Sequence, residues 1–398
     1  MSLNSTLKRI DSIDVLRGIV MVIMAIDHVR DFVHDQAYTG DPLNVLTTTP
    51  FLYFTRWITH LCAPTFVFLS GLSIYLQSIR KSKAELSSFL FKRGIWLVFV
   101  ELVLITLAIT FNPFYNLVLL QVIWAIGISM ILLGFLSRLP YKVVLAIGLV
   151  IVLGHNVLDF WEAAPGFKAG FWWDLFHHGL FSVYPIVGDH YLAIMYPFVP
   201  WTGLMILGYC FGVFFTSKFT SAERQKILYK TGSFLLGFFV VLRAINVYGD
   251  PHPWTTQASG FATFLSFMNV NKYPPSLAYM SVMIGIAILA LAFLENIHNK
   301  ITNLFRVFGR TAFFYYILHF YFVHLIATLL YFYKGHTLDD ATKGLQKVPF
   351  LFVTPGEGYE LSFVYLLWIL LIAGLYPLCK WYDSYKTAHK EKWWLSYL

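Results

Sequence analysis

The chain has 398 residues, of which 58% are hydrophobic, 19% are aromatic and only 13% are charged. This composition excludes a soluble globular protein and indicates a polytopic membrane protein. The net charge of +8 is spread over short segments between apolar stretches, without a basic recognition helix or zinc finger. It therefore argues against a nucleic-acid partner and for contact with the anionic headgroups of membrane lipids.

Apolar segments long enough to cross about 30 Å of hydrocarbon recur along the whole chain. We expect an all-α membrane protein, a single domain over residues 1–398 with about ten membrane-spanning helices in one bundle. The expected spans are residues 12–34, 55–79, 88–111, 115–136, 141–160, 192–216, 231–248, 276–296, 309–333 and 361–383. Lys and Arg concentrate in alternate loops, which predicts that both termini are cytoplasmic and that the protein lies in the inner membrane.

The first span carries Asp14, Arg17, Asp27 and His28 within or beside an apolar run. Charged groups are costly in lipid, so they are a sign of function. From Arg17 to His28 the helix turns by about 1100°, which brings both side chains to nearly one face about 16 Å apart. Asp14 precedes Arg17 by three residues, and this spacing predicts a structural ion pair between them.

The second span carries His60 near its outer end, one turn after Arg56. The short connection between the first two spans would allow His28 and His60 to face each other. We predict that His28 acts as a general base or transient acyl acceptor, and that Asp27 and His60 orient it.

Two extramembrane stretches, residues 161–191 and 249–276, combine aromatic side chains with histidines and prolines. Such stretches suit a sugar or an amphipathic ligand at the membrane surface, or else form part of the interfacial aromatic belt. The side chains that could stack on a sugar ring are Trp161, Trp172, Trp173, Trp254 and Tyr273.

The ninth span, residues 309–333, carries Arg310 and His324 14 residues apart. On one continuous helix they would lie within about 40° of one face and about 21 Å apart, as if lining a slot for an extended cofactor arm. The start of that helix would add positive potential at Arg310. Alternatively, Arg306 and Arg310 are cytoplasmic anchors and His324 is an interfacial residue.

Cysteine and histidine spacing gives no sign of a metal. Cys62, Cys210 and Cys379 stand singly in apolar segments, which is typical of packing residues. The sequence has no HExxH motif and no CxxC pair, so we expect no metal.

Five segments together carry a resemblance to a known family: IDVLRGIVMVIMAIDH, TRWITHLCAPTFVFLSG, NKYPPSLAYM, FGRTAFFYYILHFYFVH and WWLSYL. They resemble the bacterial branch of the heparan-alpha-glucosaminide N-acetyltransferase family, and the first is also similar to the wider transmembrane acyltransferase group. The resemblance implies a ten-helix membrane fold that takes acetyl from cytoplasmic acetyl-CoA. The acceptor would be an amino sugar or a glycan hydroxyl on the outer side.

The resemblance also implies site residues. In lysosomal members an asparagine matches His28, an aspartate matches His60, and the reactive histidine lies in the intervening loop, where this chain offers His34. The wider group has a histidine that matches His28. We therefore expect His28 to be catalytic, with His60 as its partner and His34 as the alternative.

Basic residues towards the cytoplasmic side would hold the phosphates of acetyl-CoA, which acts as a co-substrate: Arg17, Arg93, Arg138, Arg306 and Arg310. The side chains expected to contact substrate are Arg56, Lys272, Tyr273, His319 and His324. N-acetylation and O-acetylation stay open, as do direct and two-step transfer. The sequence is compatible with a homodimer.

Two further function classes compete with acetyl transfer. A transporter of a small polar or sugar-like solute would use similar intramembrane charges, but the sequence lacks the inverted repeats typical of many transporters. A haem or quinone oxidoreductase would need facing histidines, and His319 and His324 lie about 140° apart around one helix.

Overall fold

The computed structural model describes residues 10–179, 181–346 and 348–396. Lys8, Arg9 and Lys347, which contribute to the predicted charge asymmetry, lie outside these ranges. So do the last two residues of the WWLSYL segment.

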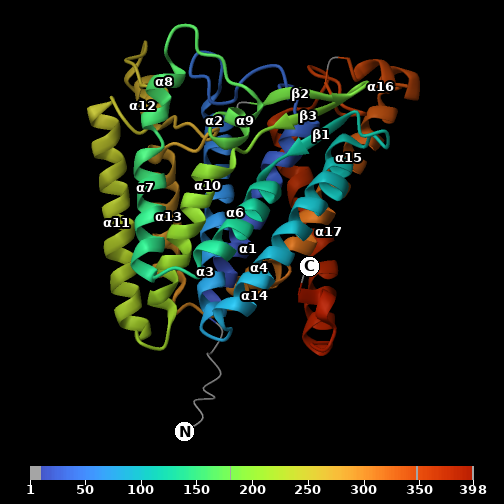
Figure 1. Ribbon diagram of the computed structural model, residues 1–398. Helices are drawn as coiled ribbons and strands as arrows, with labels where there is room; N and C mark the ends of the chain where they lie inside the picture. The colour runs from blue at the N-terminus through green and yellow to red at the C-terminus, as the bar shows by residue number, and fades with distance from the viewer. Residues whose placement is uncertain (1–9, 180, 347, 397–398) are drawn as a thin grey trace.

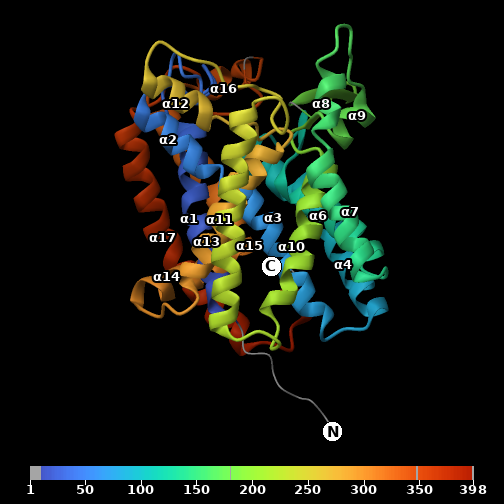
Figure 2. The same ribbon diagram turned by 90° about the vertical axis from the view of Figure 1, so that its left-hand side faces the viewer.

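The protein is a bundle of long helices, most of which run between an upper and a lower end in the view of Figure 1. The helices are α1 (Asp11–Val33), α2 (Pro50–Thr59), α3 (Cys62–Ser78), α4 (Lys83–Val100), α5 (Thr106–Thr110), α6 (Val122–Leu136), α7 (Tyr141–Gly154), α8 (Val157–Glu162), α9 (Phe171–Phe176), α10 (Phe198–Phe211), α11 (Ser221–Ile245), α12 (Gly260–Met268), α13 (Leu277–Leu294), α14 (Lys300–Arg310), α15 (Ala312–Tyr333), α16 (Leu338–Gly344) and α17 (Leu361–Ala388). A π-helical turn, η1 (Glu101–Ile105), joins α4 to α5, and 3₁₀ turns follow α10 as η2 (Gly212–Phe215) and α17 as η3 (Trp393–Ser396). Helix α11 lies at the left edge of the bundle in Figure 1 and faces the viewer in Figure 2, and it packs along α13.

Eight helical segments of the described chain are long and apolar enough to cross a membrane. They are Pro50–Ser78, Lys83–Thr110, Tyr141–Glu162, Phe198–Phe215, Ser221–Ile245, Leu277–Leu294, Ala312–Tyr333 and Leu361–Ala388. Helix α1 has 23 residues but carries several charged side chains, and α6 is apolar but has only 15 residues. The multi-pass architecture is thus shown, whereas ten spans and cytoplasmic termini stay predictions.

A small sheet covers part of the upper end, where we expected helix and loop (Figure 1). Its strands are β1 (Leu117–Leu120), β2 (Ser182–Val187) and β3 (His190–Ile194), in the order β1-β3-β2. Strand β3 pairs in parallel with β1, with Leu117 opposite Tyr191, and antiparallel with β2. The prediction that residues 115–121 start a helical span was wrong, because a short apolar run does not distinguish a buried strand from a helix.

The ninth predicted span is also interrupted. Helix α14 ends at Arg310 and α15 begins at Ala312, with the backbone of Thr311 at φ −112° and ψ 23°. Arg310 therefore closes one helix while His324 belongs to the next, so the predicted shared face is wrong. Arg310 also lies at a helix C-terminus, where the dipole contributes negative rather than positive potential.

Glycines set the closest helix contacts. A Cβ atom added at Gly18 of α1 would lie 1.8 Å from Phe305 O of α14, and one added at Gly309 would lie 1.8 Å from Asp14 O. The backbones of α1 and α14 therefore touch directly. Gly208 of α10 approaches Phe68 O of α3 in the same way, as small-residue pairs do in membrane bundles.

A Gly309→Val substitution should destabilise the bundle, because the obstructing atoms belong to the backbone of α1 and cannot rotate away. We expect a loss of about 3 kcal/mol or more in unfolding free energy, measured by thermal melting in detergent. Gly237→Ala is the matched control, because nothing lies within 4 Å of a Cβ atom added there. Equal melting temperatures for both variants would contradict the packing described for α1 and α14.

Candidate functional site

A central cavity of about 570 Å³ opens between the upper part of α1, α2, α15 and the small sheet. Its volume lies in the range of small-molecule binding sites. Its walls are largely apolar, including Met24, Phe66 and Phe320. Its charged and titratable side chains are Asp27, His28, Arg30, Asp31, Tyr38, Asp41, Arg56, Cys62, Tyr196, Lys272, Tyr273 and Tyr316.

His28 faces this cavity and hydrogen-bonds to His319 of α15. The distance between His28 Nδ1 and His319 Nε2 is 2.6 Å, and His319 Nδ1 lies 3.2 Å from Tyr315 O. A carbonyl oxygen can only accept, so Nδ1 of His319 carries the proton and its Nε2 accepts from His28 Nδ1–H. Neutral His28 then has its lone pair on Nε2, which has no hydrogen-bond partner in the described chain. This is the tautomer of a general base.

Packing fixes the orientation of the His28 ring. Phe320 stacks on it with ring centroids 4.2 Å apart, and His319 stacks at 4.9 Å. The side chain of His319 is fully buried behind His28. Since His319 does not line the cavity, it is placed to position His28 rather than to touch substrate as we expected.

Asp27 is the centre of a buried charge network beside His28. It accepts a charge-assisted hydrogen bond from Arg56 of α2, and Arg30 Nη2 lies 2.9 Å from its Oδ1. Arg30 also donates to Asp31, over 2.5 Å. The carboxylate of Asp27 is therefore committed to two guanidinium groups, and it influences His28 through its charge.

Lys272 adds a third positive group to the wall of the cavity, after Arg30 and Arg56, and it lies beside Tyr273. Lys272 is only 9% exposed, and its Nζ lies 5.0 Å from the centre of the Tyr273 ring. Burial acts to raise the pKa of Tyr273, but the charges of Lys272 and Arg56 outweigh it and lower this pKa. Lys272 forms no ion pair with a carboxylate among the described residues, so its charge is available to a ligand.

His60 lies on the other side of this wall. It occupies the break between α2 and α3 and lines a second cavity of about 270 Å³, which shares Arg56, Lys272 and Tyr273 with the first. The side chain of His60 is buried, with its Nδ1 unpaired in the described chain and its ring edge-on to Tyr279. The hydrogen-bonding partner of His28 is thus His319 and not His60.

Two other predicted histidines lie apart from the central cavity. His34 caps the end of α1, where its Nδ1 accepts from Gln36 N over 3.1 Å, and it lines a separate small cavity of about 40 Å³. His324 is fully buried and lies between Ala108 O at 3.1 Å and Leu351 O at 2.7 Å. These contacts indicate a packing role for His324.

The five arginines predicted to hold acetyl-CoA lie away from the central cavity. Arg17 contacts Asp14 over 3.0 Å and Ser73 Oγ over 3.0 Å, which links α1 to α3. The others are also engaged: Arg306 with Asp11, Arg310 with Asp383 and Thr387, Arg138 with Ser87, and Arg93 through a further polar contact. They therefore stabilise the lower half of the bundle as well as making it positive.

The aromatic side chains expected to stack on a sugar are divided among several sites. Tyr273 lines the central cavity, whereas Trp161 and Trp173 line a third cavity of about 460 Å³ beside α8 and α9. Trp254 donates through Nε1 to Arg243 O over 2.6 Å, and Trp172 is exposed. Of these aromatic side chains, only Tyr273 lines the same cavity as His28.

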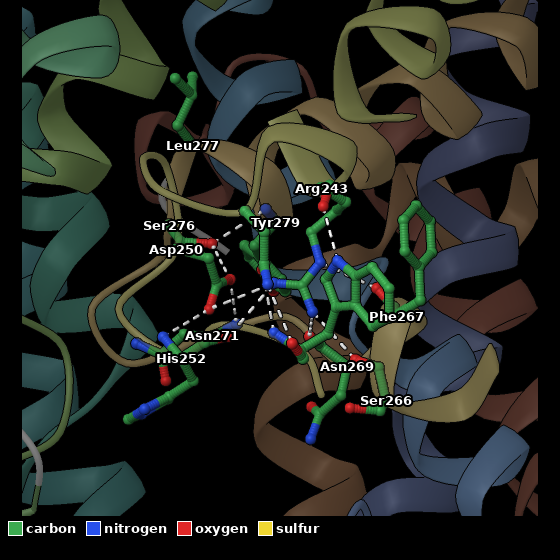
Figure 3. A network of polar contacts seen from close by, with 12 residues as sticks. Arg243, Asp250, His252, Ser266, Phe267, Asn269, Asn271, Ser276, Leu277 and Tyr279 are labelled. Atoms are coloured by element: carbon green, nitrogen blue, oxygen red, sulfur yellow. Dashed lines mark hydrogen bonds and ion pairs between the residues drawn. The ribbon is translucent and has the colours of Figure 1, made fainter. Parts of the chain in front are cut away.

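Arg243 organises the loop that carries Lys272 and Tyr273 (Figure 3). Its guanidinium group is buried and donates to backbone oxygens of Ser266, Phe267, Asn269 and His252 over 2.9 to 3.3 Å. Asp250, 3.8 Å from Arg243 Nη1, accepts from Asn271 N and Ser276 Oγ. Arg243 therefore fixes the start of the segment between α12 and α13, and Asp250 fixes its end at Ser276.

An Arg243→Met substitution should loosen this loop, because four backbone carbonyl oxygens lose the guanidinium group that donates to them. We expect a loss of about 3 kcal/mol or more in stability and faster proteolysis or hydrogen exchange within residues 249–276. Lys226→Met, at an exposed site of the same helix α11, is the control. Unchanged exchange in that loop for Arg243→Met would refute its organising role.

Sequence reasoning missed Glu101. It is fully buried in the π-helical turn η1, and its Oε2 accepts from Trp124 N over 2.9 Å, so it caps the start of α6. The residues at that start, Gln121 and Val122, line the central cavity. A lone acidic residue in an apolar span was the available signal.

The chain is similar to a known protein family. Residues 9–249, more than half of the chain, match the family described as heparan-alpha-glucosaminide N-acetyltransferase, catalytic. No curated protein matches the chain. The matched region contains Asp27, His28, Arg56 and His60 but ends before Lys272 and His319.

Proposed function

Because the chain belongs to the heparan-alpha-glucosaminide N-acetyltransferase catalytic family, we propose that it is a membrane acetyltransferase that uses acetyl-CoA. The acceptor is an amino sugar or a glycan hydroxyl. The donor binds from the cytoplasmic side of the inner membrane, and the acceptor binds from the outer side. The observation that carries this proposal is the orientation of His28, whose unprotonated Nε2 faces a partly charged cavity.

In the direct mechanism, His28 Nε2 removes a proton from the acceptor amine or hydroxyl as that group attacks the thioester carbonyl. A C–N or C–O bond forms, the C–S bond breaks, and CoA leaves as a thiol after taking up the proton. In the two-step alternative, His28 Nε2 attacks the thioester first, the C–S bond breaks and CoA leaves as a thiolate. The acceptor then attacks the acetyl-imidazole, which frees His28, and the proton of the acceptor passes to CoA. In both routes Arg56 and Lys272 supply positive charge near the developing oxyanion, and Tyr273 contacts the acceptor.

The proposal is tested with purified protein, labelled acetyl-CoA and a panel of amino sugars and glycans. We expect acceptor-dependent release of CoA and label in the sugar. If no acceptor in the panel becomes labelled, and vesicles that contain the protein show substrate-dependent solute flux instead, the result would favour a transporter.

We expect Arg17→Gln to raise the KM for acetyl-CoA about tenfold with a smaller effect on kcat. A phosphate contact binds the ground state and the transition state alike, so its loss appears in KM. Lys230→Gln, an exposed change on α11, is the control for altered surface charge. If Arg17→Gln binds CoA with wild-type affinity, entry of the donor past the lower half of α1 is wrong.

A further inference from the structure

A cluster of metal-ligating side chains lies at the upper end of the bundle, outside the central cavity. Asp159 and Glu162 are three residues apart on α8, which places them on one face of the helix. His177 follows α9 directly. One candidate ligand atom from each of the three residues lies within 4.8 Å of the others.

The charge of this cluster lacks a fixed counterion. Asp159 and Glu162 are both partly buried, and neither forms an ion pair with a Lys or Arg in the described chain. Asp159 Oδ2 accepts only from the neutral amide of Asn156 over 2.6 Å. Asp159 Oδ1 is shielded from solvent and has no hydrogen-bond partner among the described residues. Asp159 Oδ1 can therefore bind a cation without breaking a hydrogen bond to another described residue.

The second ring nitrogen of His177 is held by a buried histidine. His177 Nε2 lies 3.1 Å from His155 Nδ1, and His177 Nδ1 lies 2.7 Å from Glu162 Oε1. If His177 Nε2 carries the proton and donates to His155, the lone pair of Nδ1 faces the carboxylate, and a bound cation can take the place of the proton that otherwise joins Nδ1 to Glu162 Oε1. Metal-binding histidines are usually oriented by such a hydrogen bond from their other nitrogen.

The rest of the surroundings are also ordered. Trp173 Nε1 donates to Glu162 Oε1 over 2.8 Å, which fixes the carboxylate. His155 is buried, and its Nε2 has no partner in the described chain. Hydrogen bonds to neighbouring side chains therefore already hold the candidate ligands Glu162 and His177 in place.

We propose that Asp159, Glu162 and His177 bind one divalent transition-metal cation of the zinc type, with a fourth position for water. Two carboxylates and one imidazole form a donor set that zinc accepts, and imidazole disfavours calcium and magnesium. The cation joins α8 to the end of α9 and neutralises the paired carboxylates. Sequence reasoning excluded a metal because the histidine and the carboxylates belong to different helices.

The test uses the full chain in detergent without a histidine tag, stripped with a chelator and then titrated with Zn²⁺. We expect one Zn²⁺ per chain by elemental analysis, and a rise in melting temperature that a chelator reverses. Asp159→Asn, Glu162→Gln and His177→Gln should each lower the Zn²⁺ affinity by more than tenfold. The His155→Gln variant should lower it by about 10- to 100-fold.

His178→Gln is the matched control, because this neighbouring histidine binds Asp174 at 2.7 Å instead. It should keep wild-type Zn²⁺ affinity. The site is refuted if the stripped protein takes up no stoichiometric Zn²⁺, if Ca²⁺ binds equally well, or if His178→Gln weakens binding as much as His177→Gln. Metal content and melting are measured without substrate, so the result is independent of acetyl transfer.

Discussion

His28→Gln is expected to reduce kcat for acetyl transfer by about two to four orders of magnitude, with little change in the KM for acetyl-CoA. General-base catalysis contributes an effect of this size, and loss of a positioned acyl acceptor would have at least the same effect. Glutamine occupies a similar volume, so the cavity should persist. The measurement is steady-state acetyl transfer with the best acceptor of the panel.

His34→Gln controls for the general effect of removing a histidine near the end of α1. It lies in a separate cavity and should retain activity close to wild type. The roles would be reversed if His34→Gln abolished transfer while folded His28→Gln remained active, and the loop histidine would then be the catalytic group.

The second large effect is expected at His319, which positions His28 without touching substrate. His319→Leu removes the acceptor of His28 Nδ1–H, so the imidazole can adopt the wrong tautomer or orientation, and kcat should fall about 100-fold. His319→Gln provides an amide oxygen that can accept the same hydrogen bond, and it should recover part of the rate. The KM for both substrates should stay near wild type.

This rescue separates positioning from packing. If His319 only fills space, leucine and glutamine should be similarly tolerated or similarly harmful, and kcat should not follow the hydrogen-bonding capacity of the side chain. Wild-type kcat in folded His319→Leu would show that the contact with His28 does not orient the base.

Sequence patterns predicted the features that depend on the spacing of residues close together in the chain. The three-residue separation of Asp14 and Arg17 matches an ion pair of 3.0 Å. Apolar run length located most of the long helices. The Thr311 break and strand β1 were missed because a continuous apolar run hides changes of backbone conformation within it.

The site depended on contacts that no local pattern contains. His28 and His319 are separated by 291 residues, and only the packing of α15 beside α1 brings their rings together. His60 is close to His28 in sequence, yet the break between α2 and α3 directs it to the second cavity. Tyr196 reaches the central wall just after β3, a strand that the sequence did not predict.

Transfer across the membrane is tested most directly in sealed vesicles that hold the protein in one known orientation. Labelled acetyl-CoA is supplied on the side opposite the central cavity, and the acceptor identified in the panel is enclosed on the side of the central cavity. The account predicts acetylated acceptor in the cavity-side compartment and free CoA in the other, with neither in His28→Gln vesicles. Product formed only when acetyl-CoA and acceptor share the cavity side, or product of equal yield with His28→Gln, would contradict it.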